Sequence, residues 1–234
     1  MDFPPGSEFR YNNTGYMLLG MLLEQVTKLP YAALMERDFF KPLGMRSAAY
    51  CPSKPTDPNY ATGYAHEGES WRVAEYLSMT HPYAAGAICM SVPDYLRWQS
   101  ALHRGRIVNA RSLALMTGPE TLTAGARKGT KTGYGMGLAT MDLDKHMAVQ
   151  HGGGINGFST QQYWFPADSL SIVAFLSTQG GQEEFLVNNL ASATFGLPTR
   201  PRLARSERCC VISYVSYRGS HERGLQESHR QPHP

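Results

Sequence analysis

The chain has 234 residues, of which 42% are hydrophobic and 18% charged, and its formal net charge is +3. A chain of this length can bury a sizeable core in one or two domains, and so small a charge gives no argument for a nucleic-acid partner. No apolar run is long enough for a membrane span. The sequence also has no basic segment followed by an apolar one, the pattern of a signal peptide, and it does not decide the cellular compartment.

The four cysteines, Cys51, Cys89, Cys209 and Cys210, do not have the paired spacing of a metal site. We therefore predict neither a metal nor a cofactor. Cys209 and Cys210 are adjacent and poorly placed to bridge each other, so cysteine usage does not decide the redox compartment.

The residues around Tyr11 indicate a polar loop that runs straight into a helix. Apolar residues recur on one face of that helix: Leu18, Leu19, Leu22, Leu23 and Val26. Asn12, Asn13 or Thr14 can cap its free N–H groups. Tyr11 and Asn13 therefore lie at the N-terminus of a rigid helix. They are either a reactive pair or a buried tyrosine beside a capping asparagine.

A second helix is predicted from Pro30, which suits a first helical position, to the segment 41–45. Its apolar stripe is Tyr31, Leu34, Met35 and Phe39. A proline-containing, loop-rich stretch follows from 46 to about 82. Its aromatic residues either line a pocket or pin the loop to the body of the protein: Tyr60, Tyr64, Trp71 and Tyr76.

Ser91 and Asp94 have the spacing of a capping box, with Ser91 as the cap of a helix that ends near Gly105. This explains Ser91 as a cap rather than as a nucleophile. A short helical segment is predicted over 112–116.

From Tyr134 onward the periodicity changes to that of strands. Short runs bounded by turn residues predict strands at 136–141, 147–151, 160–165 and 171–177, with a turn at Pro166–Ser169 that makes the last two a hairpin. A final helix is expected over 183–195, with four side chains inward: Phe185, Leu186, Leu190 and Ala193. Helices, then hairpin-linked strands, then a helix indicate an α+β fold.

Residues 1–196 form the recognisable domain, and 197–234 form a basic tail with seven Arg against three Glu. We expect this tail to be disordered, and only Val211–Tyr217 has a composition that suits a strand. Such a tail can contact acidic partners or membranes, or it can be a solvated appendage without function.

Five motifs stand in an order typical of one superfamily. They are Pro4-Pro5-Gly6 with Phe9-x-Tyr11-x-Asn13-x-Gly15-Tyr16-x-Leu18-Leu19-Gly20, then Pro42-Leu43-Gly44-Met45, Ala85-Gly86 with Ser91-x-x-Asp94, Tyr134-Gly135-Met136-Gly137, and His151-Gly152-Gly153-Gly154 with Gly157-Phe158. From about Phe3 to Phe195 the chain resembles the penicillin-recognising serine hydrolases, above all class C β-lactamases, D-alanyl-D-alanine carboxypeptidases and related esterases. The resemblance implies a β-lactamase/transpeptidase-like antiparallel sheet flanked by helices, plus a helical subdomain.

Two implied site residues come from the first motif. Acyl transfer from an amide or ester needs a nucleophile, a base and donors for the oxyanion. Tyr11 matches the tyrosine that shares proton transfer with the family's lysine, and Asn13 matches the asparagine that binds this lysine and the substrate amide. A phenol with a pKa of about 10 is a poor base at neutral pH, so the implied mechanism includes cations that stabilise the tyrosinate.

The other implied site residues come from the last motif. His151 stands where other branches of the superfamily place the lysine of Lys-Thr-Gly. Gly152 and Gly153 leave room for a substrate along the strand edge, and the N–H of Gly154 is the implied oxyanion donor. The alternative is a glycine-rich hairpin loop without chemistry. A literal Lys131-Thr132-Gly133 is interpreted as a decoy, because it precedes the strands instead of lying in one.

The 234 residues contain no Ser-x-x-Lys, the motif that supplies the family's nucleophile and lysine. Only ten residues precede Tyr11. We therefore expect a family member truncated at the front, without the N-terminal strands and the nucleophile helix, and with foreign sequence at the back. The missing strands would leave an open sheet edge and an uncovered apolar face.

Three functions compete on this sequence. The first is a serine hydrolase that acts on β-lactams, D-Ala-D-Ala peptides or esters through an acyl-enzyme, incomplete in this chain. The second is a non-catalytic protein that binds a ligand or partner through the remaining cleft. The third is an inactive product without a stable fold. The expected partner of the first is a small-molecule or peptide substrate.

Overall fold

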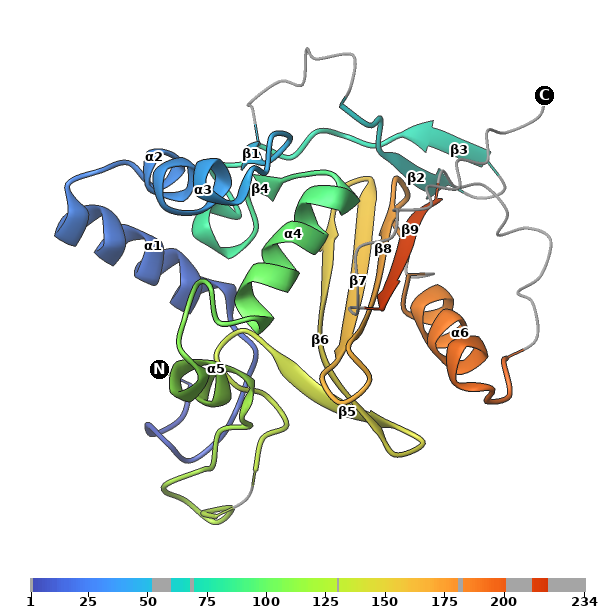
Figure 1. Cartoon of the computed structure of the whole chain (residues 1–234). Coiled ribbons are helices and arrows are strands. Elements are labelled where there is room, and N and C mark those ends of the chain that lie inside the picture. The colour runs from blue at the N-terminus through green and yellow to red at the C-terminus, as the bar shows by residue number, and fades with distance from the viewer. Residues whose placement is uncertain are drawn as a thin grey trace.

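The computed structural model describes residues 2–51, 60–67, 70–129, 131–180, 183–200 and, as backbone only, 212–218. A five-stranded sheet lies between helices: α6 (Glu183–Phe195) covers one face and α4 (Val92–His103) the other (Figure 1). The remaining helices lie beyond α4, on the same side of the sheet. The α+β fold predicted from the order of the elements is confirmed.

The sheet is an antiparallel meander of β5 (Ala139–Leu143), β6 (His146–Ile155), β7 (Phe158–Phe165), β8 (Leu170–Leu176) and β9 (Ile212–Arg218). The four predicted strands are present with shifted ends, and the hairpin at Pro166–Ser169 is confirmed. Ala139, the first residue of β5, pairs with Gln150 of β6. Among the described residues, 151–155 therefore pair only with β7, and their other edge is free.

The last strand, β9, comes from the predicted tail. Its backbone pairs antiparallel with β8, from Leu176 opposite Ile212 to Leu170 opposite Arg218. A strand is thus present where the composition allowed one over 211–217, and it pairs with the outer edge of β8. The division of the chain between residues 196 and 197 stays a prediction.

The core lies between the sheet and α6. Its fully buried side chains come from β7, β8 and the middle of the helix: Tyr163, Phe165, Leu170, Ile172 and Val187. The helix spans the predicted residues, but its buried positions are Val187, Ala191 and Ser192. Leu186 and Leu190 pack against this core as predicted, and Phe185 is half-buried, but the prediction for Ala193 is wrong, since Ala193 is exposed. The small residues Ala191 and Ser192 allow the helix to approach the sheet closely on their side.

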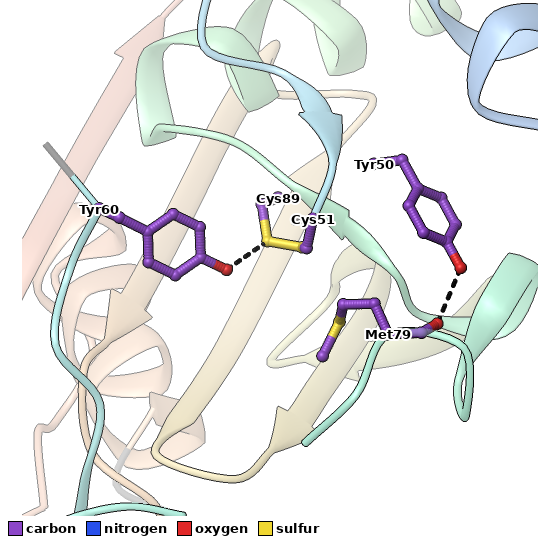
Figure 2. Close-up of a disulfide and its surroundings, with 5 residues drawn as sticks. All are labelled: Tyr50, Cys51, Tyr60, Met79 and Cys89. Carbon is purple, nitrogen blue, oxygen red and sulfur yellow. Dashed lines mark hydrogen bonds between the residues drawn. A yellow bond between two sulfur atoms is a disulfide. The ribbon is translucent and has the colours of Figure 1, made fainter. Parts of the chain in front are cut away.

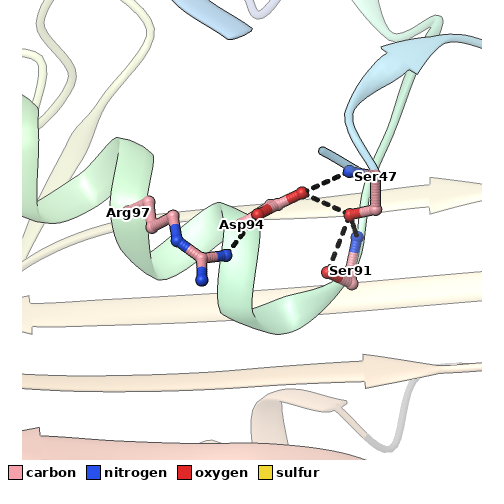
Figure 3. A network of polar contacts seen from close by, with 4 residues as sticks. All are labelled: Ser47, Ser91, Asp94 and Arg97. Atoms are coloured by element: carbon pink, nitrogen blue, oxygen red, sulfur yellow. Dashed lines mark hydrogen bonds and ion pairs between the residues drawn. The ribbon is translucent and has the colours of Figure 1, made fainter. Parts of the chain in front are cut away.

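The start of α4 is fastened by Asp94, which is 2% exposed (Figure 3). Ser91 is the N-cap residue, as predicted, but its side chain makes no capping bond, so the hydrogen bonds of the predicted capping box are not formed. Instead, the backbone N–H of Ser47 donates to Asp94 at 2.6 Å, and the N–H of Ser91 donates to the Ser47 hydroxyl at 3.0 Å. Burial raises the pKa of Asp94, but hydrogen bonds from Ser47 and Arg97 outweigh it and lower the pKa. Ser91 therefore has a structural role.

Helix α1 (Asn13–Thr27) begins where the sequence predicts, yet its apolar face is not buried. Gly20 is its only buried residue. A Cβ at Gly20 would lie 2.3 Å from the Cβ of Ala84, in the short helix η2 (Tyr83–Ala85). The long apolar side chains are exposed: Leu18, Leu19, Met21, Leu22, Leu23 and Val26. No helix of the described residues is long and apolar enough to cross a bilayer.

The second predicted helix consists of three pieces: α2 (Tyr31–Met35), a π-helical turn η1 (Glu36–Phe40) and α3 (Lys41–Leu43). Pro30 is the N-cap residue, so the helix begins at Tyr31, one place after the predicted start. The π-turn adds a residue and rotates the C-terminal part of the helix, so Phe40 is buried where the stripe predicts Phe39. Phe39 packs on Trp98 with ring centroids 5.3 Å apart. The short helix after α4 is α5 (Ala110–Thr117).

A disulfide between Cys51 and Cys89 joins the paired strands β1 (Ala49–Tyr50) and β4 (Ile88–Cys89) (Figure 2). It closes the loop-rich stretch, which contains the hairpin of β2 (Tyr64–Glu67) and β3 (Ser70–Val73). The Tyr60 hydroxyl lies 2.8 Å from the Cys89 sulfur. Tyr60 thus pins the loop, whereas Tyr64 and Tyr76 stay 37% and 39% exposed.

The same stretch packs against the β6–β7 hairpin. It also pairs with the residues that follow β8: the backbone N–H of Tyr64 donates to the Ser177 carbonyl at 3.0 Å, and the Tyr64 carbonyl accepts from the Gln179 N–H at 2.8 Å. A Cβ at Gly157 would lie 2.7 Å from the Cα of Gly63, so the two backbones touch. The loop-rich stretch is thereby held against the β6–β7 turn and the residues that follow β8.

Candidate active site

The N-terminal segment carries Tyr11 to the end of the sheet. The carbonyl of Gly6 accepts the N–H groups of Thr123 at 2.9 Å and Ala124 at 3.0 Å, which fastens the chain ahead of α1. Asn12 is the cap, because its side chain accepts the N–H of Gly15 at 2.9 Å. Tyr11 is 52% exposed, so the alternative of a buried tyrosine is wrong.

A tight turn brings Tyr134 to the same place. The N–H of Gly135 donates to the Leu138 carbonyl at 2.7 Å, and Tyr134 forms a β-bridge with Ala139 at the start of β5. Gly137 has φ +79°, a conformation that side chains rarely adopt. This turn folds Tyr134 back beside β6 at the point where β5 stops pairing with it.

His151 joins the two tyrosines from the free end of β6. Its ring centroid lies 5.9 Å from that of Tyr11 and 5.9 Å from that of Tyr134. Its Nδ1 contacts the Gly152 carbonyl, an acceptor, so Nδ1 carries the proton. Nε2 is then the acceptor of the 2.8 Å hydrogen bond from the Tyr134 hydroxyl. The contact with the backbone thereby favours the tautomer in which His151 accepts a hydrogen bond from Tyr134.

The phenol of Tyr134 stays protonated and donates this hydrogen bond. Burial raises its pKa to about 12, and the neighbouring phenols Tyr11 and Tyr16 add to the rise. The pKa of Tyr16 is raised as well, by burial and then by Tyr11.

The glycines after His151 are present for different reasons. A Cβ at Gly152 would lie 2.5 Å from Gln161 Oε1, and one at Gly153 would lie 2.7 Å from Thr160 Oγ1. Cross-strand packing on β7 is therefore enough to explain these two glycines. A Cβ at Gly154 would meet nothing within 4 Å, and Gly154 has no positive φ. Its missing side chain leaves open space at the free edge of β6.

Asn13 lies in the first turn of α1 with an exposed side chain. Because Asn12 supplies the cap, the amide of Asn13 is not used for that purpose. Within the described residues Asn13 makes no hydrogen bond to Tyr11, Tyr134 or His151. Lys131 forms an isolated bridge with Thr121 outside the five-stranded sheet, as its interpretation as a decoy requires.

The model of the family described as Beta-lactamase matches residues 1–196. The chain belongs to this Beta-lactamase family. The described part has the β-lactamase/transpeptidase-like fold, since it superposes on a D-stereospecific amidohydrolase from Streptomyces sp. with a TM-score of 0.71 at 24% identity. The match covers 84% of this chain and 58% of that one.

Two further proteins are similar to this member of the Beta-lactamase family. A D-aminopeptidase from Brucella anthropi is 27% identical over 227 residues, which are 95% of this chain and 41% of the relative. A D-amino acid amidase from Ochrobactrum anthropi SV3, complexed with L-phenylalanine amide, has a TM-score of 0.67 at 22% identity, over 81% of this chain and 58% of that one. The chain thus spans between 41% and 58% of the length of these three relatives.

The residue that sequence reasoning missed is Tyr134. The motif Tyr134-Gly135-Met136-Gly137 could have indicated this residue, and the structure explains why both of its glycines are needed. A Cβ at Gly135 would lie 2.4 Å from the Met116 carbonyl, and Gly137 supplies the positive φ. A motif whose glycines build a tight turn presents its leading side chain at a fixed place. In this member of the Beta-lactamase family that side chain is the hydrogen-bond partner of His151.

Proposed function

We propose that this chain carries the substrate-binding and proton-transfer half of a serine hydrolase that cleaves D-aminoacyl amides or peptides through an acyl-enzyme. The observation that carries the proposal is the hydrogen bond of Tyr134 to His151, with Tyr11 beside it, at the free edge of β6. Family membership supports the acyl-transfer chemistry. The names of the relatives favour D-amino acid amides and peptides over the β-lactams and esters that the sequence analysis also considered.

In the proposed reaction a substrate lies along residues 152–154 with its carbonyl at the N–H of Gly154. Tyr11 and the Tyr134–His151 pair exchange protons with the nucleophile and the leaving amine. Asn13 binds the substrate amide from the start of α1. The 234 residues contain no Ser-x-x-Lys, so the proposal assigns the nucleophile to sequence outside them.

The test is a titration of the chain with D-phenylalaninamide, compared with its L-enantiomer. We expect the D-form to bind more tightly. Gly154→Val should abolish binding while leaving the melting temperature unchanged, because a side chain there meets only open space. Met147→Val is the matched control: Met147 is 59% exposed at the far end of β6, and its replacement should leave binding intact. Binding that survives Gly154→Val would contradict the proposed substrate position.

A second experiment concerns the nucleophile. The intact mass is measured after incubation with a fluorophosphonate and, separately, with a penicillin. We expect an unchanged mass for the folded 234-residue chain. A stoichiometric adduct would identify a serine of this chain as the nucleophile and overturn its assignment to other sequence.

A further inference from the structure

A second apolar cluster lies apart from the core under α6. Its buried members come from the loop-rich stretch and the strands that close it: Cys51, Met79 and Ala87. Ile155, the last residue of β6, packs against this cluster. Side chains of a strand alternate between its two faces, and Ala148 of β6 belongs to the core under α6. Ile155 therefore lies on the opposite face, the one that carries His151, and the cluster borders the free edge of β6 at its other end.

The disulfide is the strongest tie between the two strands that hold this cluster (Figure 2). β1 and β4 pair through two residues each, and so short a ladder is marginal by itself. The N–H of Cys51 adds one hydrogen bond to the Ala87 carbonyl at 2.8 Å. The bond between Cys51 and Cys89 joins the same strands covalently and closes a loop over a sequence separation of 38. The arrangement of the cluster therefore depends on this bond.

The closed loop contacts the β6–β7 turn at two further points. The side-chain amide of Asn156 donates to the Glu75 carbonyl at 3.2 Å. The backbones of Gly63 and Gly157 touch. Together with the packing of Ile155, these contacts attach three consecutive residues, 155–157, to the loop. Gly154 directly precedes them, so a displacement of the loop is transmitted to the N–H at which the proposed substrate carbonyl lies.

The larger core does not depend on the disulfide. It lies between the sheet and α6, on the other face, and neither Cys51 nor Cys89 belongs to it. We therefore expect the chain without the disulfide to keep its sheet and to loosen only the cluster at the end of β6. A chain that stays folded in both states can respond to reduction at its site.

We propose that the Cys51–Cys89 disulfide is a redox switch that positions Gly154, through Ile155, for substrate binding. The inference rests on the proposed function. The oxidised chain is the form that binds substrate, and a dithiol converts it to a form that binds substrate weakly. The cysteines act here as positioning residues, because they reach the substrate only through the end of β6.

The reduction is an exchange between a dithiol and the disulfide. A thiolate of the dithiol attacks the sulfur of Cys89, the less buried cysteine, and Cys51 leaves as a thiolate that takes up a proton. The second thiol then forms the disulfide of the oxidised dithiol and displaces Cys89. Two electrons thereby pass from the dithiol to the cysteines, and both cysteines end as thiols. The Tyr60 hydroxyl, 2.8 Å from the Cys89 sulfur, can donate to the departing thiolate.

The test compares the oxidised and the reduced chain. Peptide mapping verifies that Cys51 and Cys89 are linked before dithiothreitol is added and separate afterwards. The affinity for D-phenylalaninamide is then measured at a temperature at which circular dichroism shows both states to be folded. We expect reduction to weaken binding about fivefold or more, and reoxidation to restore it. The backbone amide signals of residues 154–157 should also differ between the two states without any ligand.

Variants separate positioning from a general loss of stability. Cys51→Ser with Cys89→Ser should bind as weakly as the reduced chain and should not respond to dithiothreitol. Ile155→Ala should bind weakly in both redox states, because it removes the contact between the cluster and β6. Ile172→Val is the matched control, since it weakens the core under α6 and leaves the cluster intact. It should bind like the wild-type chain and keep the response to reduction.

The outcomes distinguish this proposal from the proposed function. Equal affinities of the folded oxidised and reduced chains overturn the switch and leave the proposed function standing. A loss of affinity in Ile172→Val as large as the loss on reduction also overturns it, because binding would then follow stability alone. Absence of binding to the oxidised chain contradicts the proposed function. In that case amide signals of residues 154–157 that respond to dithiothreitol still support the coupling of the disulfide to β6, and unchanged signals overturn it.

Discussion

The two halves of the candidate site rest on very different supports. The strand half, with His151 and the glycines after it, belongs to a sheet whose inner face is closed by α6 around a fully buried core. The helix half, with Tyr11 and Asn13, belongs to α1, which touches its neighbours through Gly20 and exposes its long apolar side chains. The first half is held by burial, and the second by a few local contacts.

This difference shows that the geometry of a site and its stability can have separate origins. Tyr11 is positioned by the cap at Asn12, by the anchor at Gly6 and by ring contacts with Tyr134 and His151. None of these contacts buries the face of α1 that carries Leu22 and Val26. We expect mutations in the sheet to cost stability and mutations on the α1 face to cost little.

The largest effect is expected in the core of the strand half. Ile172→Ala removes a fully buried side chain on β8 and should lower the free energy of unfolding by about 2–5 kcal/mol. Met147→Ala on the exposed surface of β6 should change it by no more than about 0.5 kcal/mol. Urea denaturation measures both. Similar losses in the two variants would show that the sheet does not have the described core.

A pH effect of about 2–3 kcal/mol is expected from His103, which stacks on Trp164 at 3.3 Å between centroids and has a buried Nδ1 without a partner among the described residues. Burial lowers its pKa to about 4, below the usual value of about 6.5. The unfolded chain therefore binds the proton first. The contribution of His103 is complete above pH 6.5 and is lost as the pH falls toward 4.

The measurement for His103 is the unfolding free energy of the wild-type chain and of His103→Phe between pH 7 and pH 4. The phenyl ring keeps the stack on Trp164 and removes the titration. The wild-type chain should lose more stability than the variant over this range. Parallel curves would contradict the lowered pKa.

An intermediate effect is expected where the helix half is attached. Gly20→Val forces a side chain against Ala84 and Tyr83 and should cost about 1–3 kcal/mol. Gly15→Ala, on the same helix where a Cβ meets nothing within 4 Å, is the control and should be neutral or slightly stabilising. Thermal melts followed by circular dichroism compare the two. Equal melting temperatures would mean that α1 is not docked through Gly20.

The smallest effect is expected on the open face of α1. Leu22→Gln with Val26→Gln should change the free energy of unfolding by less than about 0.5 kcal/mol each and should reduce binding of a hydrophobic dye. Leu34→Gln, a buried position on α2, is the contrasting control and should unfold the helical subdomain. A loss of more than about 1 kcal/mol from the α1 pair would show that the face is covered in solution.

Sequence periodicity and family resemblance predicted most of this architecture. The final helix at 183–195, the hairpin at Pro166–Ser169 and the proximity of Tyr11 to His151 are all present. The resemblance supplied the last of these, since 140 residues separate the two side chains and no local pattern relates them.

The features that escaped prediction depend on contacts between distant segments. The pairing of Cys51 with Cys89 requires two short strands to lie side by side, and the spacing of four cysteines does not contain that information. The exposure of α1 could not be read from its apolar stripe, because a stripe predicts a face that can be buried and not the surface that buries it. Ser47 holds the start of α4 from far along the chain by accepting the N–H of the N-cap residue Ser91, where the sequence predicted hydrogen bonds within a local capping box.

The most direct test of the proposed substrate site is a map of where D-phenylalaninamide binds. Backbone amide shifts in ¹⁵N-labelled chain are followed as the ligand is added. We predict that the shifts concentrate at His151 and residues 152–154, with Tyr134 and Tyr11 next, and that they vanish in Gly154→Val. Shifts confined to the apolar face of α1, or unchanged by Gly154→Val, would contradict this prediction, because the free edge of β6 would then not be the substrate site.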